Sequence, residues 1–481
     1  MKFKPFALTL PLLAAALASC GGGSSSPSKE IVVPFWTTFG QKNAEALQKK
    51  ANEFASIMEK QQNVKVRIDI TYQGSYDDML NKVTNGFSAG NVPTMAIAYP
   101  DHVANYLANE PKAGDYVYNV APYMEDAEIG FGKQSYLGDA KGKDDFVEAF
   151  IDEGNHYIHQ GTYSMPFMKS SEVMFYNFDA AKRAMATYKP EIANSDDKIK
   201  EFIGSLTWDE FLKFGEHCLA NKSTVLDTMK QPIWYDSDSN LFISKLFQEK
   251  IGYCSINNLN KGQIDFESGE NRTKAEAFVT SLVEARSKGL LTTKGVEGTY
   301  GSDSFKAGES LFEIGSSGGT GYAMPEGAAF EVAVAKVPVS NNNPSYVSQG
   351  PTVAFLKNPS LSKEANDERA KYGLQFYKYI TNPDSNVYLC IYGSEGYLPV
   401  RYSAYDTPEF AEFLENGEIY AETAQVLIND INGNYFNSAV FKGSAELRDQ
   451  CGGIVTAALR GTGGTVTQIF DEAITQAKKG F

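Results

Sequence analysis

The chain of 481 residues is long enough for two or three domains with full cores, and its 42% hydrophobic and 21% charged residues are typical of a globular protein. Its formal net charge is -15, and it contains no cluster of Lys and Arg. We therefore exclude nucleic acid as an expected partner, because binding a phosphodiester backbone needs a basic face.

The first twenty residues have the pattern of a lipoprotein signal peptide. Lys2 and Lys4 precede an apolar run, residues 5–18, that is shorter than the roughly 20 apolar residues of a membrane-spanning helix. The run ends in small residues before Cys20. We predict that residues 1–19 are cleaved as a signal peptide and that Cys20 is lipidated, whereas the alternative is an ordinary secretory signal with a chance cysteine.

A Gly/Ser-rich stretch follows the cysteine, and we predict that residues 20–30 form a flexible tether between the lipid and the folded chain. Cleavage would remove two lysines and take the net charge from -15 to -17. No later apolar stretch approaches membrane-spanning length, so the expected location is the cell envelope, with the lipid as the only anchor.

Strands and helices alternate after the tether. The apolar pattern predicts strands at 31–36, 64–70 and 95–99 and helices at 43–61 and 76–87. Such alternation indicates βαβ units on a largely parallel sheet, in which ligands bind at the carboxyl ends of the strands.

A second α/β region begins near the apolar strand 173–176. Thr207 and Glu210 have the spacing of a capping box at a helix start. A strand at 311–314 leads into a Gly/Ser loop, 315–321, and a helix predicted after this loop would leave backbone N–H groups free to hold an anion. Further strands are predicted at 331–337 and 351–356, with amphipathic helices in most of the remainder.

Four cysteines remain besides Cys20. In an exported protein they allow three pairings, and we favour Cys218 with Cys254 and Cys390 with Cys451. The alternative is that some of them are buried free thiols.

Catalytic motifs are weak in this chain. Residues 315–319 fit the G-x-S-x-G pattern around Ser317, but all four histidines precede it, so the Ser, Asp, His chain order of that hydrolase class is not met. His156 and His159 lie near two acids, an arrangement that we interpret as a solvated helix face and not as a metal site. We predict neither a metal nor a cofactor.

Aromatic residues make up 12% of the chain, and several fall in predicted turns. Aromatic faces stack on sugars while their O–H and N–H groups bond hydroxyls, so the set suits a carbohydrate or polyol, although core packing explains any one of them equally well. From this set we take Trp36 and Trp234 as candidate ligand contacts.

Several short motifs occur in an order that resembles a known family. They are the Phe-Trp pair at 35–36, the YxGxY turn at 72–76, the strand ending in Tyr-Asn at 176–177, Thr-Trp-Asp-Glu at 207–210 and Gly-Tyr-Leu-Pro at 396–399. Together they resemble the extracellular solute-binding proteins of ABC importers, family 1, and within it the glycerol-3-phosphate-binding members.

The resemblance implies the type II periplasmic-binding-protein fold, an α/β fold of two lobes, each a mainly parallel sheet flanked by helices, with ligand between them. Transferred to this chain, it places 31–160 plus 300–345 in the first lobe and 161–299 plus 346–481 in the second.

It also implies a ligand site. The positions that match the family's contacts are Tyr72, Asp101, Ser170, Ser171, Ser316, Ser317, Gly350, Tyr397 and Arg448. Asp101 stands where the glycerol-phosphate binders carry Glu, and Arg448 falls near their phosphate-pairing arginine, with Arg401 as a competing candidate.

We therefore expect a monomeric, lipid-anchored subunit that captures a glycerol-phosphate ester or a sugar by hinge closure and delivers it to ABC permease subunits with their ATPase, without catalysis. The alternatives are an exported carbohydrate hydrolase using paired carboxylates such as Asp236 and Asp238, or an adhesin on the same fold.

Overall fold

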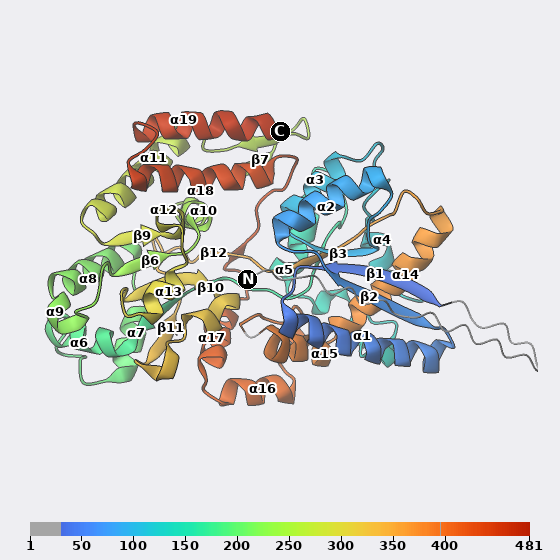
Figure 1. Cartoon of the computed structure of the whole chain (residues 1–481), viewed down its shortest axis with the longest axis horizontal. Helices are drawn as coiled ribbons and strands as arrows, with labels where there is room; N and C mark the ends of the chain where they lie inside the picture. The colour runs from blue at the N-terminus through green and yellow to red at the C-terminus, as the bar shows by residue number, and fades with distance from the viewer. Residues whose placement is uncertain (1–29, 395) are drawn as a thin grey trace, which may run out of the picture.

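The computed structural model describes residues 30–394 and 396–481. The predicted signal peptide, Cys20 and most of the predicted tether lie outside these residues. The described chain forms two α/β lobes that lie side by side (Figure 1). Within the described part of the chain, no helix combines the length and the apolar character needed to cross a membrane.

The first lobe is built on a five-stranded sheet of order β2-β1-β3-β13-β4. β1 is parallel to β2 and β3, whereas β13 is antiparallel to β3 and β4. The strands are β1 (Ile31–Thr37), β2 (Val66–Tyr72), β3 (Met95–Ala98), β4 (Met165–Pro166) and β13 (Thr352–Phe355). The helices of this lobe are α1 (Gln41–Gln62), α2 (Tyr76–Ala89), α3 (Pro100–Ala108), α4 (Ala121–Met124), α5 (Glu148–Asp152), α14 (Lys363–Ile380) and α15 (Pro383–Tyr388).

The second lobe has a five-stranded sheet of order β11-β5-β10-β6-β9. β10 is parallel to β6, and β6 to β9, but β5 runs antiparallel to both of its neighbours. The strands are β5 (Glu172–Asn177), β6 (Ile233–Tyr235), β9 (Leu291–Thr293), β10 (Phe312–Ser316) and β11 (Val332–Ala335). Two small ribbons complete the fold, β7 (Cys254–Ile256) with β8 (Gly262–Ile264) and β12 (Tyr346–Val347) with β14 (Tyr435–Phe436).

Helices cover the second sheet, and α18 and α19 lie along the outer edge of this lobe (Figure 1). They are α6 (Phe178–Tyr188), α7 (Asp196–Gly204), α8 (Trp208–Ala220), α9 (Lys222–Val225), α10 (Asp238–Gln248), α11 (Gly269–Ser287), α12 (Lys294–Glu297), α13 (Gly301–Lys306), α16 (Pro408–Glu415), α17 (Ile419–Ile428), α18 (Ser444–Arg460) and α19 (Val466–Ala477). α8 begins with the predicted capping box between Thr207 and Glu210.

The predicted two-lobed α/β fold is confirmed, but its sheets are mixed and not mainly parallel. The assignment of 300–345 to the first lobe is wrong, since β10 and β11 complete the second sheet. The assignment of 346–481 to the second lobe is wrong in part, because β13 lies between β3 and β4 of the first sheet. The chain therefore crosses between the lobes after β4, before β13 and again after α15.

The predicted disulfides do not form, and all four described cysteines are free thiols. Cys218 is buried in α8, and Cys254 lies in the β7 ribbon with its Sγ 3.4 Å from the carbonyl oxygen of Ala439. Cys390 follows α15 in the first lobe, whereas Cys451 lies in α18 of the second. The alternative of buried free thiols is thus the one that the structure supports.

Candidate functional site

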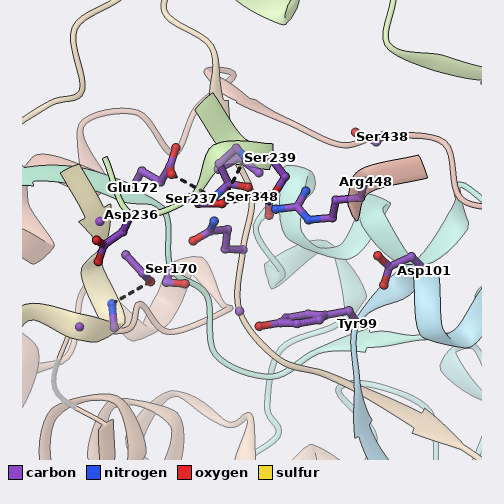
Figure 2. A pocket seen from close by; sticks show the side chains of 18 of the residues that line it. Tyr99, Asp101, Ser170, Glu172, Asp236, Ser237, Ser239, Ser348, Ser438 and Arg448 are labelled. Atoms are coloured by element: carbon purple, nitrogen blue, oxygen red, sulfur yellow. Dashed lines mark hydrogen bonds between the residues drawn. The ribbon is translucent and has the colours of Figure 1, made fainter. Parts of the chain in front are cut away.

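A cavity of about 900 Å³ lies between the two lobes. Its size falls in the range of small-molecule sites, roughly 300 to 1,000 Å³. The first lobe contributes the turn after β3, and the second contributes the ends of β5, β6 and β10 and the start of α18. Figure 2 shows Glu172 and Asp236 on one side of this cavity and Tyr99 and Asp101 on the other.

The turn after β3 is held in place by aromatic stacking. The Tyr99 ring stacks on the Tyr76 ring at a centroid distance of 4.0 Å and an angle of 12°. Pro100 starts α3 at a position where its missing N–H costs no hydrogen bond. Asp101 follows within the first turn and lines the cavity.

Three carboxyl groups of the second lobe line the opposite wall. Asp236 directly follows β6, and Glu313 lies on the neighbouring strand β10, where the Asp236 N–H donates to the Ile314 carbonyl at 2.9 Å. Glu172 comes from β5, whose antiparallel direction brings its first residue to this edge of the sheet. The mixed sheet thus gathers three acids at one end.

Burial changes the protonation of these acids. It raises the pKa of Glu172 to about 7, against the opposing effect of hydrogen bonds from Tyr235 and Asn240. Burial also raises the pKa of Asp236 and, together with repulsion from Asp236, raises the pKa of Glu313 well above its usual value. Both shifts favour a proton held between the Asp236 and Glu313 carboxyls.

A chain of hydrogen bonds connects Glu172 to Arg448. The Tyr235 hydroxyl donates to Glu172 Oε2 at 2.6 Å, and Asn240 Nδ2 donates to Oε1 at 3.0 Å. Arg448 Nη2 in turn donates to Asn240 Oδ1. Arg448 therefore reaches the cavity with one N–H group already engaged (Figure 2).

Buried polar atoms without partners mark the cavity as a binding site. Among the described residues, Glu313 Oε2, Ser348 Oγ and Asn437 Oδ1 are buried, belong to cavity-lining residues and have no hydrogen-bond partner. Such atoms are rare in folded proteins, because each costs about 1–3 kcal/mol. Asn437 Oδ1 accepts, whereas the Ser348 hydroxyl and a protonated Glu313 carboxyl can also donate, so a ligand with both donors and acceptors, such as a polyol, can complete them.

The structure brings together part of the site predicted from sequence. The predicted residues that line the cavity are Asp101, Ser170, Ser316, Gly350, Tyr397 and Arg448. The predicted residues that are absent from its lining are Tyr72, Ser171, Ser317, Trp36 and Trp234.

Strand geometry explains why only one of the two serines after β4 lines the cavity. Successive side chains of an extended chain point to opposite sides, so Ser170 lines the cavity whereas Ser171 turns into the protein and donates its hydroxyl to the Val347 carbonyl at 2.8 Å. Ser317 is fully buried, and its N–H donates to the Ser171 carbonyl.

The predicted aromatic contacts lie elsewhere. Tyr72 ends β2 with 64% of its surface exposed, and Trp36 packs on the second hydrophobic cluster, between α2, α3 and the first sheet. Trp234 is buried beneath Gly301, where a Cβ atom would come within 2.2 Å of its ring.

Gly350 serves the crossing between the lobes. Its φ of 106° is in the region that favours glycine, and a Cβ atom would lie 2.3 Å from the Met168 carbonyl oxygen. This close approach pairs Ser170 with Gln349 in an antiparallel bridge. Gly350 therefore joins two of the crossing segments and also lines the cavity.

The Gly/Ser loop is less suited to an anion than its sequence predicts. Most of it forms a 3-10 helix, Ser317–Ala323, and no α-helix begins at this loop. The Ser317 N–H donates to Ser171 and the Gly318 N–H to Ser316 Oγ. Two of the N–H groups expected for phosphate are thus already occupied.

The other catalytic and ligand candidates are structural. Asp238 turns away from Asp236 and accepts hydrogen bonds from Thr293 Oγ1, Thr456 Oγ1 and the Gly295 N–H, so the two carboxyls form no pair across a substrate. Arg401 is fully buried in the first lobe, with Nη1 3.0 Å from Asp139 Oδ1.

Sequence reasoning did not identify the acids Glu172, Asp236 and Glu313 as ligand contacts, nor the aromatic wall. The additional tyrosines that line the cavity are Tyr99, Tyr253, Tyr300 and Tyr322. The only sequence feature that marks the three acids is their position near the ends of strands. This position becomes informative only after the strand order of the second sheet is known.

Comparisons with known proteins agree with this architecture. A family model described as bacterial extracellular solute-binding protein matches residues 52–416. The sn-glycerol-3-phosphate-binding periplasmic protein UgpB of Escherichia coli (strain K12) is 26% identical over 181 residues, which are 38% of this chain and 36% of that protein. The chain therefore matches only about a third of the length of this curated relative.

Solved structures match almost the whole chain. The cyclic alpha-maltosyl-1,6-maltose binding protein from Arthrobacter globiformis superposes with a TM-score of 0.67 at 17% identity, covering 94% of this chain and 99% of that one. UgpB from Mycobacterium tuberculosis, in complex with glycerophosphocholine, gives 0.64 at 17% identity, covering 94% and 98%. These likenesses show a shared fold.

Proposed function

Because the chain belongs to the bacterial extracellular solute-binding proteins, we propose that it is the substrate-capture subunit of an ABC importer and binds a polyhydroxylated solute between its lobes. The family and its structural neighbours are ligand-binding proteins of the cell envelope. The observation that carries the proposal is the set of unpartnered buried polar atoms in residues that line the cavity, Glu313 Oε2, Ser348 Oγ and Asn437 Oδ1.

The polarity of the cavity favours a neutral or donor-rich ligand over a phosphate ester. Sugar hydroxyls supply hydrogen-bond donors, whereas an ionised phosphate supplies only acceptors. Acidic residues outnumber basic ones among the lining residues: Asp101, Glu153, Glu172, Asp236, Asp303 and Glu313 against Lys294 and Arg448. Tyrosines complete the wall and provide faces on which a sugar ring stacks.

A glycerol-phosphate ester is the second candidate, supported by Arg448. Its guanidinium lines the cavity, and its one hydrogen bond among the described residues is with the neutral amide of Asn240, so it is available to pair with an anion. The E. coli relative named above is a sn-glycerol-3-phosphate binder, which supports the same candidate.

Capture would proceed by closure of the lobes. The segments that cross between the lobes are joined by short backbone bridges, including Ser170 to Gln349 and Lys169 to Leu398. Small changes of backbone angle in such segments rotate one lobe against the other. The closed form would present both lobes to the permease, and a lipid on Cys20 would keep the subunit at the membrane.

Calorimetry with two ligand panels tests this function. Neutral mono- and oligosaccharides form one panel, and sn-glycerol-3-phosphate with its diesters forms the other. We expect binding of a neutral sugar that survives Arg448→Ala. Tight binding of a phosphate ester that is lost in Arg448→Ala, by about 2–5 kcal/mol, would instead establish the second candidate. Turnover of a bound sugar to products would contradict a transport role and support the hydrolase.

A further inference from the structure

The acid pair at the end of β6 and β10 lies where the cavity meets the second sheet. Asp236 and Glu313 come from neighbouring parallel strands, so their side chains emerge next to each other. Gly315 leaves the room they need, because a Cβ atom there would lie 2.4 Å from Glu313 Oε1 and 3.4 Å from Asp236 Oδ2. The two carboxyls therefore converge on one point of the cavity wall.

The protein satisfies one of these acids and leaves the other open. Asp236 Oδ1 accepts the Gly301 N–H at 2.6 Å. Glu313 is only 3% exposed and lines the cavity, and among the described residues no N–H or O–H donates to its Oε2. Glu313 also shares a side-chain hydrogen bond with Asp236, so Oε2 is the oxygen of this cavity-lining carboxyl that is left for a donor on the ligand.

The charged groups around Asp236 and Glu313 are mostly negative. The groups that act on the pair are Glu172 from β5, Lys294 from α12 and Asp303 from α13. The Lys294 ammonium stands over the Tyr300 ring at 3.6 Å. Arg448 reaches this side only through Asn240. Four carboxyls, those of the pair, Glu172 and Asp303, thus lie around a position near which the described residues place one ammonium.

We propose that Asp236 and Glu313 form a subsite for a protonated amino group carried by the ligand. An ammonium group offers three N–H donors and a full positive charge, so it would bond the open Oε2 and balance one of the two carboxylate charges. A hydroxyl offers one donor and no charge. The inference rests on the proposed function and narrows the ligand to an amine-bearing polyhydroxyl compound.

The aromatic rim supports the same class of ligand. Tyr300 and Tyr322 line the cavity with 55% and 71% of their surfaces exposed. The position of Lys294 over Tyr300 shows that this rim accepts an ammonium against a ring face.

Binding of such a ligand would release a proton. Burial raises the pKa of both acids, and repulsion from Asp236 raises the pKa of Glu313 further, which favours a proton on the empty pair. An ammonium stabilises the doubly ionised pair and displaces that proton. Affinity for the amine should therefore rise with pH until the amine itself loses its proton.

Three disaccharides of the same skeleton provide the test: the β-1,4-linked glucosamine dimer, its N-acetylated form and cellobiose. Titration calorimetry on the full folded chain, in two buffers of different ionisation enthalpy, measures affinity and proton release together. We expect the diamine to bind at least about tenfold more tightly than cellobiose, with proton release that cellobiose does not cause.

Variants separate the pair from general negative charge. Glu313→Gln should abolish the preference for the diamine and its proton release, and Asp236→Asn is the second variant should the first not fold. Glu270→Gln is the matched control, because Glu270 lies in α11 of the same lobe outside the cavity lining, where its exposed carboxylate pairs with Lys274 at 2.6 Å. The control should keep the preference.

Cellobiose binding as tightly as the diamine, a preference that survives Glu313→Gln, or failure of all three probes at millimolar concentration would overturn the subsite. The last outcome, combined with binding of another neutral sugar, would leave the proposed function standing. Absence of binding in every panel would remove both.

Discussion

Two buried clusters of charged residues in this protein differ in their balance of positive and negative charge. In the first lobe, Asp139 is fully buried between two cations, with Lys378 Nζ at 3.1 Å and Arg401 Nη1 at 3.0 Å. In the cavity, Glu172, Asp236 and Glu313 lie together, and within the described chain their wall has one ammonium near it, that of Lys294.

The difference lies in the balance of charge within each cluster. Lys378 donates to the carbonyls of Ile129 and Gly130 and to Gln134 Oε1, each at 2.8 Å, and the Gly132 N–H donates to Asp139. The cavity cluster sets three carboxyls near one ammonium and leaves Glu313 Oε2 without a donor among the described residues. The first cluster thus pairs opposite charges inside the fold, whereas the second leaves acidic groups in excess beside the cavity.

Removing the charge at the centre of the first cluster should have the largest effect. Asp139→Asn leaves two buried cations without compensation, so we expect a loss of about 3–5 kcal/mol in the free energy of unfolding, measured by urea denaturation. The matched control is Asp69→Asn, because Asp69 pairs with Arg67 at 2.6 Å on the surface, both half exposed. The control should cost at most about 1 kcal/mol. Equal losses would remove the distinction between the clusters.

The cavity cluster should make the free energy of unfolding depend on pH. Glu172 has its pKa raised to about 7 by burial, so the folded state holds this proton more tightly than the unfolded state. Its contribution is fully present below the usual carboxyl pKa and is lost as the pH rises through 7, by roughly 3 kcal/mol.

Unfolding free energies measured from pH 4.5 to 8 check this sign. Glu172→Gln should flatten the decline seen in the parent protein, because an amide does not titrate. Its oxygen can still accept from Asn240, and its NH2 can donate to the Tyr235 hydroxyl. A decline of unchanged slope in the variant would assign the pH dependence to other groups.

Aromatic residues sharpen the comparison between cavity and surface. Tyr397 lines the cavity and lies so close to the 3-10 helix that a Cβ atom on Gly318 would come within 2.7 Å of its ring. Tyr397→Ala should weaken ligand binding by about 1–3 kcal/mol. Tyr72→Ala, the variant of an exposed tyrosine outside the cavity lining, should leave affinity within about 0.5 kcal/mol of the parent protein. Both are measured by calorimetry with the ligand that the panels identify.

Local elements were predictable because they depend on local pattern. The strands at 31–36 and 64–70, the helix at 76–87 and the capping box at Thr207 all occur within a few residues of their predicted bounds. The order of strands was not, because it depends on contacts far apart in sequence. β13 enters the first sheet between β3 and β4, which no local pattern around 352–355 indicates.

The site shows the same limit. Ser170 and Ser171 are equivalent in the sequence motif, and only the register of the crossing segment decides that Ser170 lines the cavity. The acids Glu172 and Glu313 have no motif at all. They come together because β5 and β10 are antiparallel neighbours in a mixed sheet that was expected to be mainly parallel.

The cysteines give the smallest expected effect. Burial raises the pKa values of Cys218, Cys390 and Cys451, and this holds them as inert thiols. A reducing agent should therefore leave the unfolding free energy of the folded domain unchanged within about 0.5 kcal/mol, and a thiol reagent should modify these three cysteines only after denaturant is added. A disulfide between Cys218 and Cys254 would close a loop of 36 residues, and its reduction would cost about 3–4 kcal/mol. A loss of that size on reduction would show that a disulfide forms in solution, and would support the pairing expected from the sequence.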